Sequence, residues 1–191
     1  MNVTSILILR RLFVRQQPAE PAIAAIKAGI GGAFAIATLF LLGYISDSPL
    51  LMAPFGATCV LLFSLPKTPL SQPINVIAGH MISVTIGLTL NSLLPHDWWS
   101  IGLAVGIAIS AMAALRVTHP PAGADPIVVF FSSPGWEYII FPVALGSIAL
   151  VLTAWLFHKL PPQSTYPVTH PKPHNPTEEN NHDTAPHSHH R

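Results

Sequence analysis

The chain has 191 residues, of which 50% are hydrophobic and only 9% are charged, and its formal net charge is +1. A soluble domain carries about 25% charged residues, so this composition excludes an ordinary water-soluble domain and indicates a protein embedded in a lipid bilayer. The near-neutral charge, with no basic stripe among aromatic residues, gives no support for nucleic-acid binding. The single cysteine, Cys59, excludes an internal disulfide.

Residues 1–20 form an N-terminal segment in which an apolar stretch precedes three arginines. A secretory signal peptide has the opposite order, so we expect a short interfacial helix instead. Its arginines, Arg10, Arg11 and Arg15, would face the cytoplasm.

Four apolar runs follow, each close to the roughly 20 residues that a helix needs to cross the hydrocarbon core of a bilayer. They are rich in glycine, alanine, serine and threonine, which allow membrane helices to pack closely. These runs cover residues 22–45, 74–94, 98–115 and 139–158.

Two shorter apolar stretches, residues 49–65 and 117–133, each begin with proline and glycine and end as an apolar helix. If both cross the membrane, Lys67 and Arg116 lie on the cytoplasmic side, as the positive-inside rule requires. If both are re-entrant loops, these two cations lie outside. We therefore expect an all-α integral membrane protein with about six crossings and with both termini in the cytoplasm. We expect its location to be the inner (plasma) membrane of a bacterium.

The two short stretches resemble each other. Residues 54–58 (PFGAT) align with residues 121–125 (PAGAD) at an offset of 67, and Gly79 aligns with Gly146 at the same offset. Two repeats of three crossings each must run in opposite directions, which is the inverted-repeat arrangement of many transporters. The fold class is therefore two inverted three-segment repeats, in which two crossings are half extended and half helical.

Proline and glycine predict irregular backbone over residues 51–57 and 118–124. Thr58 and Asp125 would then take the N-cap positions of the helices that follow. Two helix N-termini would point into the bundle from opposite sides, and their free N–H groups and partial positive charge suit a small anion.

Three side chains inside apolar segments are candidates for function. Asp125 is a helix cap or a carboxylate that couples transport to protons, and His80 is an intramembrane histidine, which is a functional candidate by default. His119 has no counterpart in the first repeat, where Met52 stands. It would contact the substrate, change charge near neutral pH, or make a structural hydrogen bond across the broken helix.

The remaining candidates are cations and backbone groups. Arg116 and Lys27 are anchors at the cytoplasmic interface, or they attract anions and face the pore. The glycines and alanines of the repeat would supply backbone N–H groups. The complete predicted substrate site comprises Lys27, Pro54, Gly56, Ala57, Thr58, His80, Arg116, His119, Pro120, Pro121, Gly123, Ala124 and Asp125.

Residues 116–126 (RVTHPPAGADP) contain the triplet His119-Pro120-Pro121, and residues 53–58 (APFGAT) form a second block. Together they resemble the signature of the HPP family of small integral membrane proteins, and the resemblance covers residues 22–158. Members of that family are implicated in nitrite transport in chloroplasts and cyanobacteria. The resemblance therefore implies a transporter or channel for a small inorganic anion, with nitrite as the best guess.

These observations predict a transmembrane domain over residues 21–160 and a disordered, histidine-rich tail over residues 161–191. We expect contact with the lipid bilayer, a homo-oligomer and possible proton coupling. We expect no cofactor and no enzymatic activity, since no nucleophile–base pair or cofactor loop is present. The alternatives are a metal or cation transporter that uses Asp125, His80, His119 and the tail, and a membrane sensor or scaffold that transports nothing.

Overall fold

The computed structural model describes residues 14, 15, 17 and 19–168. The predicted interfacial helix and most of the histidine-rich tail therefore lie outside the described residues. The described part consists of helices and contains no strand, which confirms the all-α prediction. The long helices are α2 (Ala22–Ile45), α3 (Pro54–Ser64), α4 (Pro73–Leu93), α5 (Trp98–Ala114), α6 (Asp125–Ser132) and α7 (Leu145–Phe157), and the short ones are η1 (Pro69–Ser71), η2 (Pro120–Ala124), η3 (Trp136–Ile139) and η4 (Ile140–Ala144).

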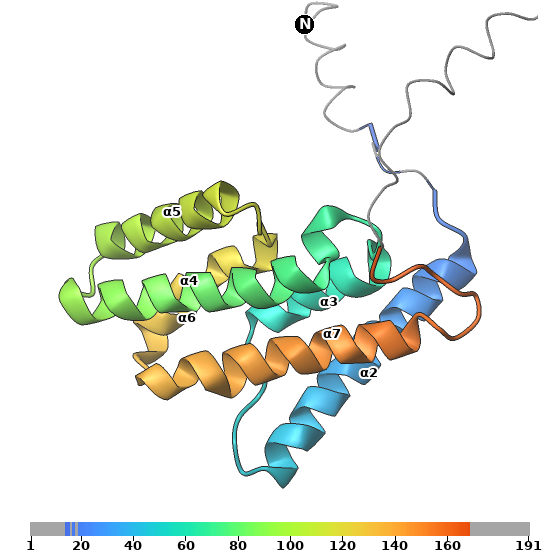
Figure 1. Cartoon of the computed structure of the whole chain (residues 1–191), viewed down its shortest axis with the longest axis horizontal. Helices are drawn as coiled ribbons and strands as arrows, with labels where there is room; N and C mark the ends of the chain where they lie inside the picture. Colours follow the sequence, from blue (N-terminus) through green and yellow to red (C-terminus); the bar gives the residue numbers. More distant parts are fainter. Residues whose placement is uncertain (1–13, 16, 18, 169–191) are drawn as a thin grey trace, which may run out of the picture.

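The helices pack around α4. Helices α4 and α7 run across the middle of the molecule, with α6 against α4 and α3 against α7 (Figure 1). Helix α5 packs on the outside of α4, and α2 crosses α3 and α7. The two short helices α3 and α6 thus lie inside the bundle, flanked by longer ones.

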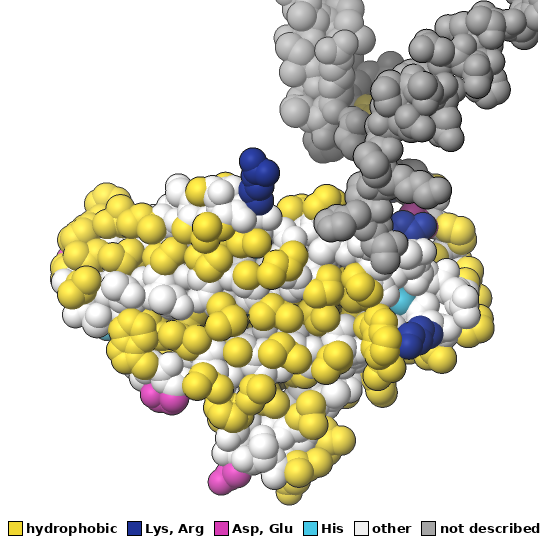
Figure 2. Space-filling view, viewed as in Figure 1, with side chains coloured by type: hydrophobic (Ala, Val, Ile, Leu, Met, Phe, Trp, Pro, Cys, Tyr) yellow, Lys and Arg dark blue, Asp and Glu magenta, His cyan; other side chains and the backbone are white. Residues whose placement is uncertain are grey.

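The surface of the bundle suits hydrocarbon. Helices α2 and α4 and the segment Trp136–Phe157 are long and apolar enough to cross a membrane, and α3 and α5 are shorter apolar helices. On α2, Ile26, Ile30 and Phe34 repeat every four residues along one face, and each is more than half exposed. Hydrophobic side chains cover most of the face seen in Figure 2, and the charged ones lie at its edges. Such a surface is stable only in lipid, so the chain is an integral membrane protein.

The two broken segments differ from the prediction in where their helices begin. Helix α3 begins at Pro54, with Ala53 as its N-cap, so Thr58 lies inside the helix and does not cap it. Helix α6 begins at Asp125, with Ala124 as its N-cap and no capping side chain. The reason is that proline, with its fixed φ, is well suited to the first turn of a helix. The helices therefore start at or before the proline, and the extended backbone is shorter than expected.

Two glycines let the non-helical segments lie directly on long helices. A Cβ atom on Gly79 would lie 3.3 Å from the carbonyl oxygen of Val117, and one on Gly146 would lie 2.9 Å from that of Leu50. Leu50 and Val117 are 67 residues apart, as Gly79 and Gly146 are. Each glycine therefore holds the broken segment of the other half of the chain, in a reciprocal pair of contacts.

Candidate functional site

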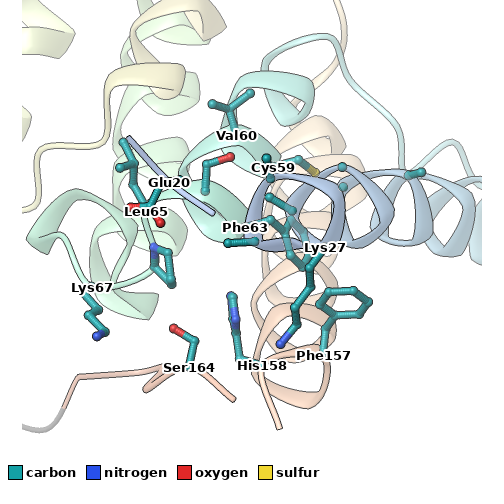
Figure 3. A pocket seen from close by; sticks show the side chains of 18 of the residues that line it. Glu20, Lys27, Cys59, Val60, Phe63, Leu65, Lys67, Phe157, His158 and Ser164 are labelled. Carbon is teal, nitrogen blue, oxygen red and sulfur yellow. The ribbon is translucent and has the colours of Figure 1, made fainter. Parts of the chain in front are cut away.

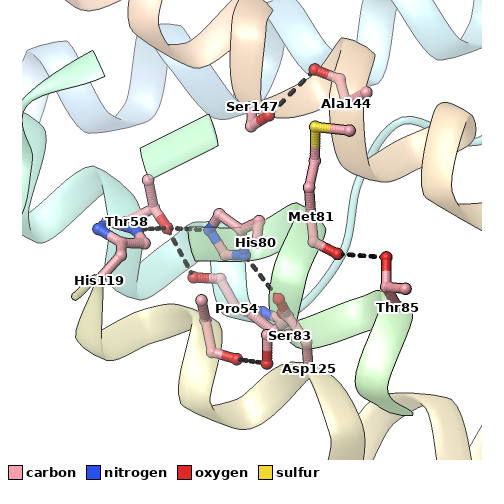
Figure 4. A network of polar contacts seen from close by, with 11 residues as sticks. Pro54, Thr58, His80, Met81, Ser83, Thr85, His119, Asp125, Ala144 and Ser147 are labelled. Atoms are coloured by element: carbon pink, nitrogen blue, oxygen red, sulfur yellow. Dashed lines mark hydrogen bonds and ion pairs between the residues drawn. The ribbon is translucent and has the colours of Figure 1, made fainter. Parts of the chain in front are cut away.

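Four polar side chains meet inside the bundle, beside the two broken segments. Thr58 comes from α3, His80 from α4, His119 from the residue before η2, and Asp125 from the start of α6 (Figure 4). All four are fully buried. Burial of a polar group without a hydrogen bond costs several kcal/mol, so the contacts of these side chains decide what the cluster can do.

The four side chains form one continuous chain of hydrogen bonds. Asp125 Oδ2 lies 2.8 Å from His80 Nδ1, and His80 Nε2 lies 2.9 Å from Thr58 Oγ1. Thr58 Oγ1 lies 3.0 Å from His119 Nε2, and His119 Nδ1 donates to the carbonyl oxygen of Leu70 in η1 at 2.8 Å. The chain therefore runs from the start of α6 to the turn between α3 and α4.

Aromatic contacts enclose this chain. The ring of Phe55 packs edge-on against that of His80, with centroids 5.2 Å apart, and the rings of His80 and His119 lie 4.9 Å apart. Phe55 is fully buried. In such an apolar enclosure, each hydrogen bond is electrostatically stronger than it would be in water.

Helix α4 also holds the irregular segment before α6. Ser83 Oγ donates to the carbonyl oxygen of Ala122 at 2.6 Å, and Asn75 Nδ2 donates to that of Thr118 at 3.0 Å. Irregular backbone at membrane depth needs such partners. Our sequence reasoning missed Asn75 and Ser83. Their signal was a polar stripe on the face of α4 that also carries His80.

An apolar groove of about 640 Å³ lies beside the cluster. Five of its lining residues come from the first broken segment and five from the second, and each residue has its partner 67 positions away. The same offset relates Thr58 to Asp125. The pairs are Ala53 with Pro120, Pro54 with Pro121, Ala57 with Ala124, Val60 with Ile127, and Leu61 with Val128.

A second, larger cavity of about 1010 Å³ lies between α2, α3 and α7 (Figure 3). Lys27, Lys67 and Gly56 line it. Lys27 Nζ donates to the carbonyl oxygen of Leu160 at 2.6 Å and to that of Pro162. Lys27 therefore links α2 to the segment after α7. It lines this larger cavity and does not belong to the buried cluster.

The structure thus divides the predicted site. It brings Thr58, His80, His119 and Asp125 together, and it places Pro54, Ala57, Pro120, Pro121 and Ala124 along the adjacent groove. Arg116 follows α5, is exposed, and has a left-handed backbone with φ of 59°. Gly123 lies within η2 beside open space. Among the described residues, no three histidine, cysteine, aspartate or glutamate side chains are placed to hold a metal ion.

The fold and the buried cluster define a helical integral membrane protein with a polar centre built from two broken helices. Residues 17–167 match the family described as HPP, transmembrane region, and the chain belongs to that family. This finding confirms the resemblance carried by the His119-Pro120-Pro121 triplet.

Two transmembrane proteins of Dictyostelium discoideum are similar to the chain. One is 35% identical over 139 residues, which are 69% of this chain and 42% of the relative. The other is 29% identical over 126 residues, which are 62% of this chain and 44% of the relative. The chain thus matches less than half of the length of either relative. No solved structure matches it significantly.

Proposed function

We propose that the protein is a transporter or channel for a small inorganic anion, with nitrite as the first candidate. The observation that carries the proposal is the buried cluster of Thr58, His80, His119 and Asp125 beside two broken helices. Polar groups and irregular backbone inside a membrane are expensive and commonly mark a transport pathway. A sensor or scaffold without a substrate would have no need of them.

Two inverted repeats of three crossings form the framework of this proposal. The paired lining of the groove and the reciprocal contacts of Gly79 and Gly146 support it, because both follow the offset of 67. In this arrangement both termini, Lys67 and Arg116 face the cytoplasm. We also propose a location in a bacterial plasma membrane. The two relatives come from a eukaryote and therefore give this location no support.

The anion would pass along the groove between the N-termini of α3 and α6. Helix N-termini carry a partial positive charge that stabilises anions. Pro54, Ala57, Pro121 and Ala124 leave the backbone of both helices close to the groove, because their side chains are small or compact. The groove is open at the protein surface, and we propose that a second copy of the chain closes it in a homo-oligomer.

Uptake of nitrite into proteoliposomes tests the proposal. We expect wild-type protein to carry nitrite faster than empty vesicles do. The variants Ala57→Leu and Ala124→Leu, which fill the groove, should abolish this flux. Ala113→Leu on the exposed face of α5 is the matched control and should leave the flux unchanged. A folded wild-type sample that carries neither nitrite nor another small inorganic anion would reject the proposal.

A further inference from the structure

The hydrogen-bond chain determines where its protons lie. We propose that Asp125, His80, Thr58 and His119 form a proton-binding relay, which holds one exchangeable proton on the Asp125 carboxyl group and passes it toward His119. The coupling of this proton to an anion rests on the proposed function, whereas the proton site itself does not.

The donors and acceptors follow from the Leu70 end of the chain. A carbonyl oxygen only accepts, so His119 Nδ1 carries a hydrogen and the Nε2 atom of a neutral His119 accepts one. The Thr58 hydroxyl group therefore donates its single hydrogen to His119 Nε2 and accepts one from His80 Nε2. Nδ1 of a neutral His80 is then an acceptor, and Asp125 Oδ2 must donate to it. Asp125 is therefore protonated.

A count of protons gives the same result. The chain has four contacts, and each contact needs one hydrogen. Thr58 and two neutral histidines supply three of them. The fourth is a proton that binds to the cluster and cancels the negative charge of Asp125. The buried cluster is then electrically neutral, which avoids the cost of an uncompensated charge in the bundle.

Two other proton arrangements fit the contacts less well. An ion pair between an ionised Asp125 and a doubly protonated His80 would need donors for both carboxylate oxygens, but Oδ1 has no partner among the described residues. Alternatively, the Thr58 hydroxyl group could donate to His80 Nε2, or to the carbonyl oxygen of Pro54, which lies farther away at 3.3 Å. His119 would then be a buried imidazolium with no carboxylate in contact.

Within the described part of the chain, no charged side chain near the cluster alters this assignment. Lys27 is engaged by backbone carbonyl groups in the other cavity, and Arg116 is exposed. The other titratable groups on the elements packed here are Cys59 on α3, which lines the larger cavity, and two residues of η3. Tyr138 is close enough to sense the charge of Asp125, and Glu137 is exposed. Cys59 and Tyr138 are neutral in their ordinary state at neutral pH.

Proton release can proceed along the chain in one concerted step. The Asp125 O–H bond breaks as His80 Nδ1 gains a hydrogen, and His80 Nε2 passes its hydrogen to Thr58. Thr58 passes its original hydrogen to His119 Nε2, and His119 Nδ1 gives its hydrogen to a water molecule near η1. Asp125 is then a carboxylate, and each of the other three groups holds the same number of hydrogens as before.

The carbonyl group of Leu70 controls this release. After the proton leaves, His119 Nδ1 and the Leu70 oxygen are both acceptors and repel each other. The step is therefore completed only when η1 or the His119 ring moves apart or a water molecule enters between them. The charge of the cluster changes from neutral to negative, which would repel an anion in the adjacent groove. Anion and proton are thus expected to move together.

Infrared spectroscopy of the folded protein in lipid tests the proton site without any transport. At neutral pH the spectrum should contain the carbonyl stretch of a protonated carboxyl group, which shifts in D₂O and is lost in Asp125→Asn. The difference spectrum between wild type and Asp125→Asn separates this band from the signals of the other carboxyl groups. Absence of the band from folded wild-type protein overturns the proposal.

A second pair of variants tests the relay. Thr58→Val removes the hydroxyl group that joins the two histidines but leaves the contact between His80 and Asp125. The exchange of the Asp125 proton with D₂O can be monitored through the same infrared band. The exchange should be slower than in wild type in Thr58→Val and should have the wild-type rate in Thr58→Ser. Equal exchange rates in Thr58→Val and wild type would overturn the relay.

Transport measurements separate proton coupling from anion transport. The amide of Asp125→Asn can donate to His80 Nδ1 and preserves all four contacts, but it cannot release a proton. An inward proton gradient should accelerate anion uptake by wild type, and it should have no effect on the uptake that remains in Asp125→Asn. Acceleration of both would overturn the coupling. If neither wild type nor Asp125→Asn carries anions, but wild type gives the infrared band, the proposed transport function fails and the proton site stands.

Discussion

Replacement of Gly79 by alanine tests how closely the His-Pro-Pro segment packs on α4. The new Cβ atom would lie 2.7 Å from the Cβ atom of His119 and 3.3 Å from the carbonyl oxygen of Val117. Neither neighbour is the free end of a flexible side chain, so the segment must move away from α4. This movement would pull His119 from its contacts with Thr58 and Leu70.

The expected effect is a balance of three contributions. Alanine in place of glycine inside a helix stabilises by about 1 kcal/mol. Overpacking of a close contact costs about 1–3 kcal/mol, and a buried polar group left without its partner costs about 1–3 kcal/mol. We therefore expect Gly79→Ala to lose about 1–5 kcal/mol of stability, and its Tm in detergent should fall by several degrees.

Gly102→Ala on α5 is the control, because a Cβ atom there would meet nothing within 4 Å. It should be as stable as the wild type or slightly more stable. Gly146→Ala should lose stability as Gly79→Ala does, since its Cβ atom would meet the ring of Phe55 and the backbone of Leu50. A Gly79→Ala variant with an unchanged Tm would refute the close packing from which these magnitudes follow.

Two further predictions concern α4 and the topology. Ser83→Ala removes one hydrogen bond from the carbonyl oxygen of Ala122, which still accepts from the backbone N–H of Asp125, and should cost about 1 kcal/mol. Ser92→Ala on the exposed last turn of α4 should be neutral in the same thermal unfolding assay. In a Cys59→Ser background, a cysteine at Lys67 should react with a membrane-impermeant thiol reagent only from the cytoplasmic side, and one at Asp97 only from the opposite side. Labelling of the cysteine at Lys67 from the outside would contradict six crossings.

The long elements were predictable because lipid imposes a simple length rule. The apolar run 22–45 coincides with α2, and the run 98–115 ends one residue beyond α5. The offset between residues 54–58 and 121–125 also anticipated which residues would meet, because the paired residues line one groove. These features depend on patterns that extend over many residues, and a single sequence is enough to show such patterns.

The details of the broken segments could not be predicted from local rules. Thr58 and Asp125 have the side chains of good helix caps. Each instead contacts His80, which lies on a helix distant in the sequence. A tertiary partner displaced the local one. Asn75 and Ser83 were missed for a related reason. A serine or an asparagine in an apolar helix is unremarkable until the carbonyl group that it satisfies is known.

The chemistry of the cluster is less symmetric than its backbone. His80 corresponds to Ser147 by the repeat, and the Ser147 hydroxyl group donates to the carbonyl oxygen of Ala144 on its own side of the bundle. His119 corresponds to Met52, which has no hydrogen to pass on. Among the residues that the structure describes, the hydrogen-bonded path from Asp125 therefore runs through His80 and His119 toward η1, and no hydrogen-bonded path runs toward η3. With Lys67 in the cytoplasm, as the six-crossing topology places it, η1 is at the inner face. The proton would then exchange with cytoplasmic water alone in the conformation described, so release to the other side requires the broken helices to move.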